Sequence, residues 1–444
     1  MARQPWLPSA ETDSPRGRGA TRACTTRAEP QPDQSGHLAR PTSPSWAVKR
    51  PRTRRPRPHS GRSWAALTYG PVGLIAERAL ANDVVDYVRF RAVCRAWRWS
   101  TEDGPRAQGC LDRRFHPRRW IMLREPPRHG HGARRRRFLN VSTGQCIQME
   151  LPELDGRRLL GATAEGLLAL LDVSTYVICL LNPLTRQLVE FPSIDPLLSE
   201  ETRTAISDYG LGYALKVSGL GLADDSTFAL FFCRPTMLVV AKPGDDHWTQ
   251  VDIGKRWLYH SAMSFSGRFY CANLRAVMAL EVPTANHQQP RLAVVAKITE
   301  RGSKMMTGTV HLVESDGNLL LLHRVRPVRK SDGRQPKYKA YRVDLDTQET
   351  VPIRGLGGHT VFLGMTSALS VAPRVFPSIR VNTVYLGFDC EERIQDEKIG
   401  AYCLLNGRVE CSRFSIDNGW VHPCDICDYL SWYVSGYCRD IDEI

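Results

Sequence analysis

The feature that most constrains the fold is a series of short apolar runs that begins at Phe138. Each run holds about four to eight apolar or β-branched residues and ends in Gly, Asp, Asn or Pro, which is typical of antiparallel strands. The runs form groups that recur about every 40 to 50 residues, and helical signals nearly vanish. This interval matches the blades of a β-propeller, whose small sheets close into a ring. We therefore predict an all-β propeller of about six or seven blades over residues 138–436, and a short C-terminal tail over 437–444.

The expected strands of this domain form five groups, separated by turn-forming residues such as Asp172 and the segment 182–186. The Trp-Asp and kelch repeat signatures do not recur, since Gly357-Gly358 is a single pair. The groups are 167–171, 176–181 and 187–191; 227–233, 237–241 and 248–251; 268–271, 276–282 and 292–298; 311–313, 318–325, 338–344 and 350–353; and 383–386, 401–405 and 409–414.

A different pattern, with helical spacing, covers Trp64 to Arg98. Pro71 can open a first helix, and Asn82 or Asp83 can cap a second one. Apolar residues recur at intervals of three or four on both sides of that cap. Two or three short helices are expected, and they bury too little surface to be stable alone. Their apolar face must therefore lie on another domain or on a partner, although periodicity alone fits an ordinary helical hairpin equally well.

The residue order within this segment resembles the F-box of plant F-box proteins. The resemblance rests on Leu67, on the run 74–78 and on the run 86–98, which ends in Val-Cys-x-x-Trp-Arg. An F-box usually starts with Leu-Pro and an acidic residue, whereas Thr68 follows Leu67 here. In that family the module binds the Skp adaptor of a cullin–RING ubiquitin ligase. The adaptor-binding residues that the resemblance implies are Leu67, Pro71, Leu74, Ile75, Leu80, Val88, Val93, Cys94 and Trp97.

The β-rich part also resembles a known domain, the propeller of the KIB kind of plant F-box protein. The resemblance rests on the segments 180–186, 317–322, 341–345, 362–364 and 382–386. It implies a multi-domain, non-catalytic substrate-recognition subunit of a Skp–cullin–F-box ubiquitin ligase. The all-α F-box would dock on the Skp-type adaptor, and through it on cullin, while the propeller recruits a protein target. The target itself is not carried over from the family.

The net charge of +14 lies in two flanks. Residues 1–60 carry 12 basic and 4 acidic residues, the connector 106–137 carries about +9, and residues 138–444 are close to neutral. The segment 1–60 is rich in Pro, Arg, Ser and Thr, so we expect a disordered tail ahead of an F-box over 61–105. A nuclear localisation signal is expected at Lys49, Arg50, Arg52, Arg54, Arg55 and Arg57.

The basic flanks leave alternatives open. Instead of an import signal, the segment could be a merely solvated tail, a transit peptide or a nucleic-acid arm. We expect the protein in the nucleus, with the cytoplasm as the alternative location. Arg134 to Arg137 are expected to form a loop, which either contacts an acidic partner or has no role. Because the propeller region lacks a positive excess, we favour the ligase subunit over a nuclear nucleic-acid-associated protein.

The sequence gives only weak indications of a catalytic or metal-binding site. The chain lacks the Gly-x-Ser-x-Gly, His-Glu-x-x-His and phosphate-loop motifs, and Gly210-Leu211-Gly212 lacks a third glycine. His422, Cys424 and Cys427, with Cys411 or Cys438, could form a zinc site, but reduced cysteines are the expected reading. We expect no catalytic residues, no cofactor and no metal. No apolar run approaches the ~18 residues of a membrane span, and residues 1–30 do not resemble a signal peptide.

Overall fold

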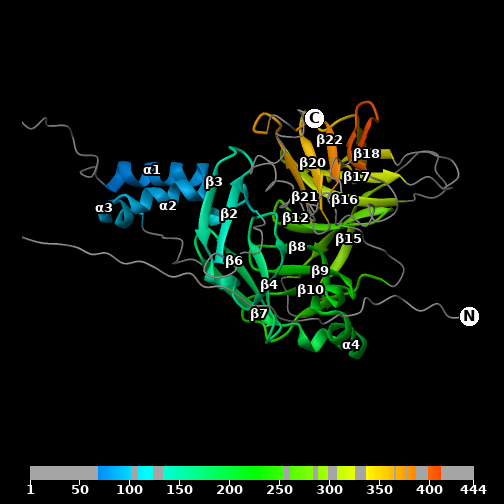
Figure 1. The fold of residues 1–444 in the computed structure, drawn as a ribbon, viewed down its shortest axis with the longest axis horizontal. Coiled ribbons are helices and arrows are strands. Elements are labelled where there is room, and N and C mark those ends of the chain that lie inside the picture. Colours follow the sequence, from blue (N-terminus) through cyan, green and yellow to red (C-terminus); the bar gives the residue numbers. More distant parts are fainter. Residues whose placement is uncertain are drawn as a thin grey trace, which may run out of the picture. The chain divides into compact units, whose positions relative to one another are not determined.

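The structure is a computed structural model in which residues 1–61 and 62–444 form two units. The described residues all belong to the second unit (Figure 1). The predicted tail, its nuclear localisation residues, Leu67 and the candidate zinc residues from His422 onward lie outside the described residues. The structure describes residues 69–101, 109–123, 134–254, 261–283, 289–298, 308–325, 337–364, 367–376, 379–386 and 399–411.

Three helices open the described part of the chain, which confirms the helical prediction: α1 (Tyr69–Asn82), α2 (Val84–Ala92) and α3 (Arg95–Trp99). Asp83 is the cap of α2, and its carboxylate accepts a hydrogen bond from the Val85 backbone N–H at 2.8 Å. Cys94 caps α3 in the same way, since its Sγ accepts from the Trp97 N–H at 3.4 Å. Both caps satisfy backbone donors that have no partner within the helix.

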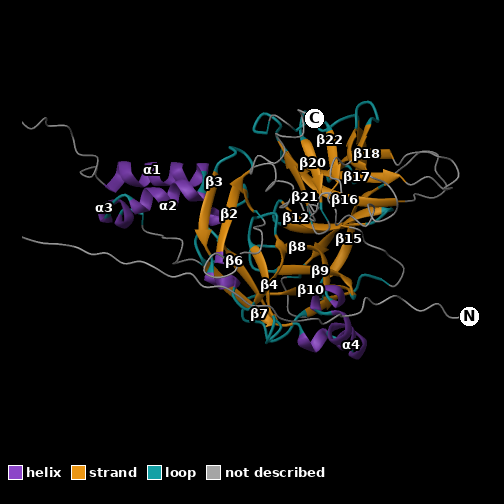
Figure 2. Ribbon diagram, in the orientation of Figure 1, coloured by secondary structure: helices purple, strands orange, loops and turns teal. Residues whose placement is uncertain are grey.

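The β-rich part contains short antiparallel strands, as predicted (Figure 2). The strands are β1 (Trp120–Met122), β2 (Arg135–Asn140), β3 (Cys146–Glu150), β4 (Arg157–Ala162), β5 (Leu168–Asp172), β6 (Val177–Asn182), β7 (Gln187–Ser193), β8 (Lys216–Leu222), β9 (Phe228–Arg234), β10 (Thr236–Ala241), β11 (Thr249–Val251), β12 (Ser261–Phe265), β13 (Arg268–Ala272), β14 (Ala276–Glu281), β15 (Arg291–Lys297), β16 (Gly308–Ser315), β17 (Asn318–Val325), β18 (Lys337–Asp344), β19 (Glu349–Ile353), β20 (Thr360–Leu363), β21 (Ala368–Val371), β22 (Thr383–Leu386), β23 (Ile399–Cys403) and β24 (Val409–Cys411).

These strands form consecutive blades. β1–β3 and β4–β7 are separate sheets, and β20–β24 form a third. The remaining twelve strands are hydrogen-bonded as one sheet, but they consist of the three meanders β8–β11, β12–β15 and β16–β19. Parallel contacts join these meanders: β8 pairs with β12, β15 pairs with β19, and Asp252 forms an isolated parallel bridge with Arg291 of β15. Within the sheet β20–β24 a further parallel pair, β20 with β22, joins the hairpin β20–β21 to the meander β22–β24. The described strands therefore form a series of antiparallel blades with parallel contacts between some of them.

Apolar clusters between neighbouring blades join them into a ring. In β17, Leu319 and Leu321 pack toward β12–β15, whereas Leu320 and Leu322 pack toward β20–β24. Alternate residues of one strand thus bury both faces of a blade, which is why the sequence reads as a continuous apolar run. The last cluster joins Leu139 of β2 to Phe362 and Val371 of β20 and β21, so the final blade packs on the first.

The sequence-based expectations need three corrections. Arg135 to Arg137 lie in β2 rather than in a loop, because β3 pairs with them and places Glu150 opposite Arg135. Strand structure begins before Phe138, since β1 lies within the predicted connector. Helical signals do not vanish, because α4 (Glu200–Tyr209) and α5 (Leu211–Ala214) separate β7 from β8. Short 3-10 helices also occur at 113–115, 152–154 and 195–197.

The expected strand list also omits β1, β3, β20 and β21, and it omits β4, β8 and β12, each the first strand of its blade. β8 and β12 approach so closely that a Cβ on Gly219 would lie within 3 Å of the Ala262 backbone. Such contacts demand glycine and weaken the apolar pattern by which a strand is recognised. No helix among the described residues has the length and apolar character to cross a membrane.

Candidate functional site

The helices α1–α3 carry apolar side chains on their outer surface. Their inner surface forms a small core of Val72, Ala76, Tyr87 and Phe90, which also includes Phe115 from beyond the helices. Large apolar side chains outside this core keep between 37% and 69% of their surface exposed, a fraction that makes them available to a partner. They are Leu74, Ile75, Val88, Val93 and Trp99. We call this set the helical apolar surface.

Four members of the helical apolar surface are among the residues that the F-box resemblance implies for adaptor binding. Trp99 was missed, although it directly follows the Trp-Arg end of the motif. Of the other implied residues, Pro71 is exposed in the first turn of α1, and Leu80 is half-buried against the helix core and the first blades. The Cys94 side chain caps the start of α3, and Leu67 lies outside the described residues.

Trp97, the residue expected to anchor an adaptor, packs mainly within the helical segment. Its ring stacks on Phe90 with the centroids 4.5 Å apart, and its side chain is half-buried. Replacing Trp97 would therefore disturb the core of the helices as well as any interface. The more exposed Leu74 and Val93 are better sites at which to probe partner binding alone.

The helices are attached to the first blade by the carboxylate of Asp83. Besides capping α2, this carboxylate accepts hydrogen bonds from Trp120 Nε1 at 3.0 Å and from Asn140 Nδ2 at 2.9 Å. Trp120 and Asn140 lie on β1 and β2, and both are buried. Arg119 adds a bond at 3.2 Å to the Asn82 carbonyl at the end of α1. One carboxylate thus caps the start of α2 and also accepts hydrogen bonds from two strands of the propeller.

The predicted connector is a packed segment in its described part, residues 109–123. Phe115 inserts into the helix core, while its carbonyl accepts from the buried Asn182 Nδ2 at 2.8 Å. Cys110 is buried among the second and third blades, and burial raises the pKa of its thiol to about 12. At neutral pH this cysteine is therefore a protonated, unreactive thiol. We call residues 109–118 the strap.

The strap lies against the turns that follow the first strands of three blades. Pro117 lies where a Cβ on Gly166 would stand, and Arg113 lies against Gly267. Arg113 also forms an ion pair with Asp225, in the turn between β8 and β9. Because β8 and β12 run parallel, such turns share one face of the ring. The strap therefore occupies that face, and the opposite face carries the other turns.

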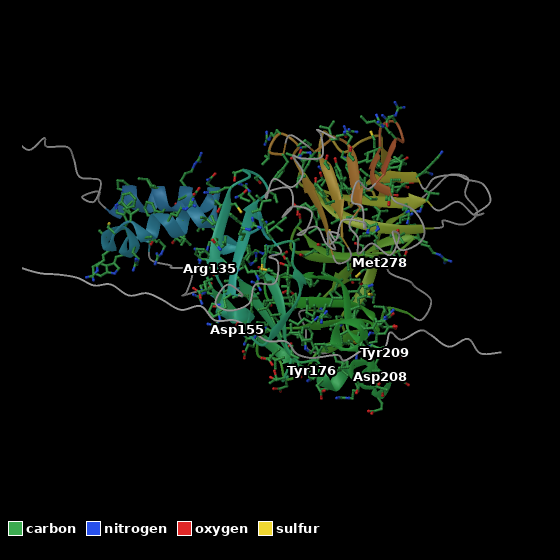
Figure 3. The ribbon with its side chains drawn as sticks, in the orientation of Figure 1. Arg135, Asp155, Tyr176, Asp208, Tyr209 and Met278 are labelled. Carbon is green, nitrogen blue, oxygen red and sulfur yellow. The ribbon has the colours of Figure 1, made fainter. Side chains whose placement is uncertain are left out.

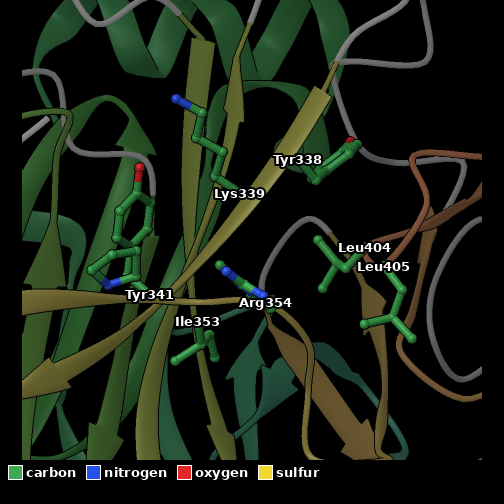
Figure 4. Close-up of a pocket in the computed structure, with 9 residues that line it drawn as sticks. Tyr338, Lys339, Tyr341, Ile353, Arg354, Leu404 and Leu405 are labelled. Atoms are coloured by element: carbon green, nitrogen blue, oxygen red, sulfur yellow. The ribbon is translucent and has the colours of Figure 1, made fainter. Parts of the chain in front are cut away.

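A pocket of about 300 Å³ opens where β18 begins and β19 ends (Figure 4). Tyr338, Ile353 and Leu404 line it together with Arg354 and the exposed Leu405. Its lining contains no carboxylate, histidine or cysteine, and its ionisable side chains are Tyr338, Lys339, Tyr341 and Arg354. Among the described residues, no three His, Cys, Asp or Glu side chains are arranged to hold a metal ion.

Packed blades preceded by a short helical segment and the strap define a β-propeller protein. A family model, the KIB1-4 beta-propeller, matches residues 138–403, and the chain belongs to this family. Such propellers are typical of plant F-box proteins and are generally non-catalytic. No F-box model matches the helical segment. No curated protein sequence matches the chain.

Solved structures give only remote likenesses. Three of the chains that match are the dihydro-heme d1 dehydrogenase NirN in complex with DHE, a protein of unknown function from Bacteroides caccae and YCF48 from Cyanidioschyzon merolae. Their identities are 14%, 11% and 10%, and their TM-scores are 0.26, 0.27 and 0.30. The matches cover 52%, 53% and 54% of this chain and 46%, 72% and 80% of those chains, so less than half of the dehydrogenase is spanned.

Proposed function

We propose that the protein is the substrate-recognition subunit of a Skp–cullin–F-box ubiquitin ligase. The observation that carries the proposal is the helical apolar surface, which exposes Leu74, Ile75, Val88 and Val93 within a segment that resembles an F-box. A KIB1-4 propeller follows that segment in the chain. Exposed apolar residues of this size on a short helical unit are suited to bury against an adaptor.

In this role the protein contributes proximity and no bond chemistry of its own. The adaptor, and through it cullin, would be held by the helices, and the protein target by the propeller. The Asp83 hydrogen bonds and the strap keep the helices and blades in one arrangement. A fixed distance between the two binding surfaces would hold a bound target near the ubiquitin-conjugating enzyme. The nuclear location remains part of the proposal.

The alternative of a nucleic-acid-binding protein receives no comparable support from the basic run 134–137. Arg134 forms an ion pair with Asp155 at 2.7 Å, and Arg135 lies opposite Glu150 in the β2–β3 pair. These arginines already have acidic neighbours, so they offer a weaker phosphate site than the sequence indicates.

The test is binding to a purified Skp-type adaptor by the variant Leu74→Glu/Val93→Glu. Both side chains are well exposed, so the variant should fold normally, yet its affinity should fall at least about 100-fold because two interface anchors are lost. The matched control is Val294→Glu, which places the same charge on an exposed valine of β15. Equal adaptor affinity in the wild type and the double variant would refute the proposed adaptor surface.

A further inference from the structure

The helices α4 and α5 form an ordered insertion between β7 and β8. Ser199 caps α4 by accepting from the Thr202 N–H at 3.2 Å, and two acidic residues follow in the first turn. Gly210, with φ +83°, ends α4 and allows the chain to turn into α5. Ile206 and Leu211 pack against the apolar cluster of the second and third blades. The insertion is thereby held on the ring.

The outer side of this insertion exposes two aromatic rings. Tyr209, labelled in Figure 3, and Tyr213 keep 68% and 53% of their surface exposed, and their ring centroids lie 5.1 Å apart. The guanidinium of Arg234 lies 4.4 Å from the centre of the Tyr213 ring and donates to the Tyr213 carbonyl at 3.5 Å. Exposed tyrosines beside arginine are the residue types enriched at the energetic centres of protein interfaces.

A second guanidinium, that of Arg158, borders the insertion at Gly212. Arg158 of β4 is exposed and lies so close to Gly212 that a Cβ there would clash with it. Neither Arg158 nor Arg234 forms an ion pair with a carboxylate among the described residues, whereas Arg203 on α4 pairs with Asp195 at 2.7 Å. Two guanidiniums without an ion-paired carboxylate among the described residues therefore lie against the insertion that carries the tyrosines. Of the acidic residues between Glu201 and Arg234, only Asp208 is next to one of the two tyrosines in the sequence.

The position of the insertion in the blade order makes this surface accessible. Arg234 ends β9, so it lies at the turn between the second and third strands of its blade. The insertion joins one blade to the next, and antiparallel order places both connections on the same face. The strap lies on the other face, against the turns after the first strands. The tyrosine surface is therefore on the face that the strap leaves open.

We propose that Arg158, Tyr209, Tyr213 and Arg234 form the surface on which the propeller binds an acidic peptide segment of its protein target. Glutamate or aspartate side chains of the target would accept hydrogen bonds from the two guanidiniums. Apolar side chains between them would pack on the tyrosine rings. This inference rests on the proposed function, since it names the chemistry of the target that the ligase subunit would recruit.

The test uses the full chain and fluorescent 12-residue peptides of repeating Glu-Glu-Leu, Gln-Gln-Leu and Lys-Lys-Leu. Fluorescence anisotropy should show binding of the Glu peptide at least about 10-fold tighter than that of the other two. The variant Arg158→Gln/Arg234→Gln should lose that preference, and Tyr209→Ala should weaken binding about 5-fold. Asp208→Asn should tighten it slightly, because a like charge is removed. Arg342→Gln, at an exposed arginine of β18, is the control.

Three outcomes would overturn the inference: equal binding of the Glu and Gln peptides, an unchanged preference in the double-arginine variant, or tighter binding of a DNA oligonucleotide through the same residues. Adaptor binding is measured on the same preparations. Acidic-peptide binding without adaptor binding would refute the ligase proposal and support this surface. Adaptor binding without acidic-peptide binding would refute this surface alone.

Discussion

Replacing Asp83 by alanine should loosen the helices from the propeller. The change removes the cap of α2, a loss of about 1 kcal/mol. It also leaves Trp120 Nε1 and Asn140 Nδ2 without an acceptor, and each unsatisfied buried donor costs about 1 to 2 kcal/mol. The attachment should therefore weaken by about 3 to 5 kcal/mol.

The variant Asp83→Asn separates the two contributions. Asparagine is a good helix cap, so its side-chain oxygen can still accept from the Val85 N–H. Its amide nitrogen is a donor, however, and would face a second donor at Trp120 or Asn140. This variant should keep the cap and lose about 2 kcal/mol of the attachment.

Hydrogen exchange followed by mass spectrometry measures this directly. Amides of α1 and α2 should exchange at least about 100-fold faster in Asp83→Ala, while those of β16–β19 stay as in the wild type. The control is Asp86→Ala on the same helix, where the carboxylate makes only an exposed bond to Asn82 and a surface ion pair at 3.5 Å with Arg89. If Asp83→Ala and Asp86→Ala exchange alike, the reasoning about the attachment is wrong.

Three further predictions concern the ring and the strap. Gly219→Ala should destabilise the chain by about 2 kcal/mol or more in urea unfolding because its Cβ meets the β12 backbone, whereas Gly73→Ala in α1 should be neutral or stabilising. Burial and the Arg118 charge lower the pKa of His116 from 6.5 to about 4, so only the unfolded chain binds a proton in that window. Stability should therefore fall by up to about 3 kcal/mol as the pH falls through it, and His116→Gln should lose that part of the pH dependence. Cys110 should react with a thiol reagent at pH 8 far more slowly than the exposed Cys146, and equal rates would contradict the packing of the strap.

The propeller was readable from the sequence wherever both faces of a strand are buried. Runs such as 167–171 and 318–325 are apolar throughout because alternate residues face different blades. The first strands β4, β8 and β12 gave no such signal. They pack against one another around the centre of the ring, where Gly219 and Gly221 have neighbours within 3 Å of a Cβ position. Tertiary contacts therefore require glycine at these two positions, and a local preference for strand structure does not explain them.

The candidate surfaces were readable only in part. Helical spacing places Val72 and Ala76 on one side of α1 and Leu74 and Ile75 on the other, but it does not say which side the propeller buries. The sequence predicts a loop at Arg135 because the pairing of β2 with β3, which places Glu150 opposite it, has no local signal in the basic run itself. The α4–α5 insertion carried a signal that was overlooked, since Ser199 and the two glutamates after it form a helix start.

The measurement that tests the central claim most directly is titration of a purified Skp-type adaptor into the wild-type chain by calorimetry. We expect one adaptor per chain, a micromolar or tighter affinity and a negative heat-capacity change, because the helical apolar surface is buried on binding. Absence of binding at about 100 μM of both proteins, a concentration at which any functional complex of this kind should form, would contradict the account.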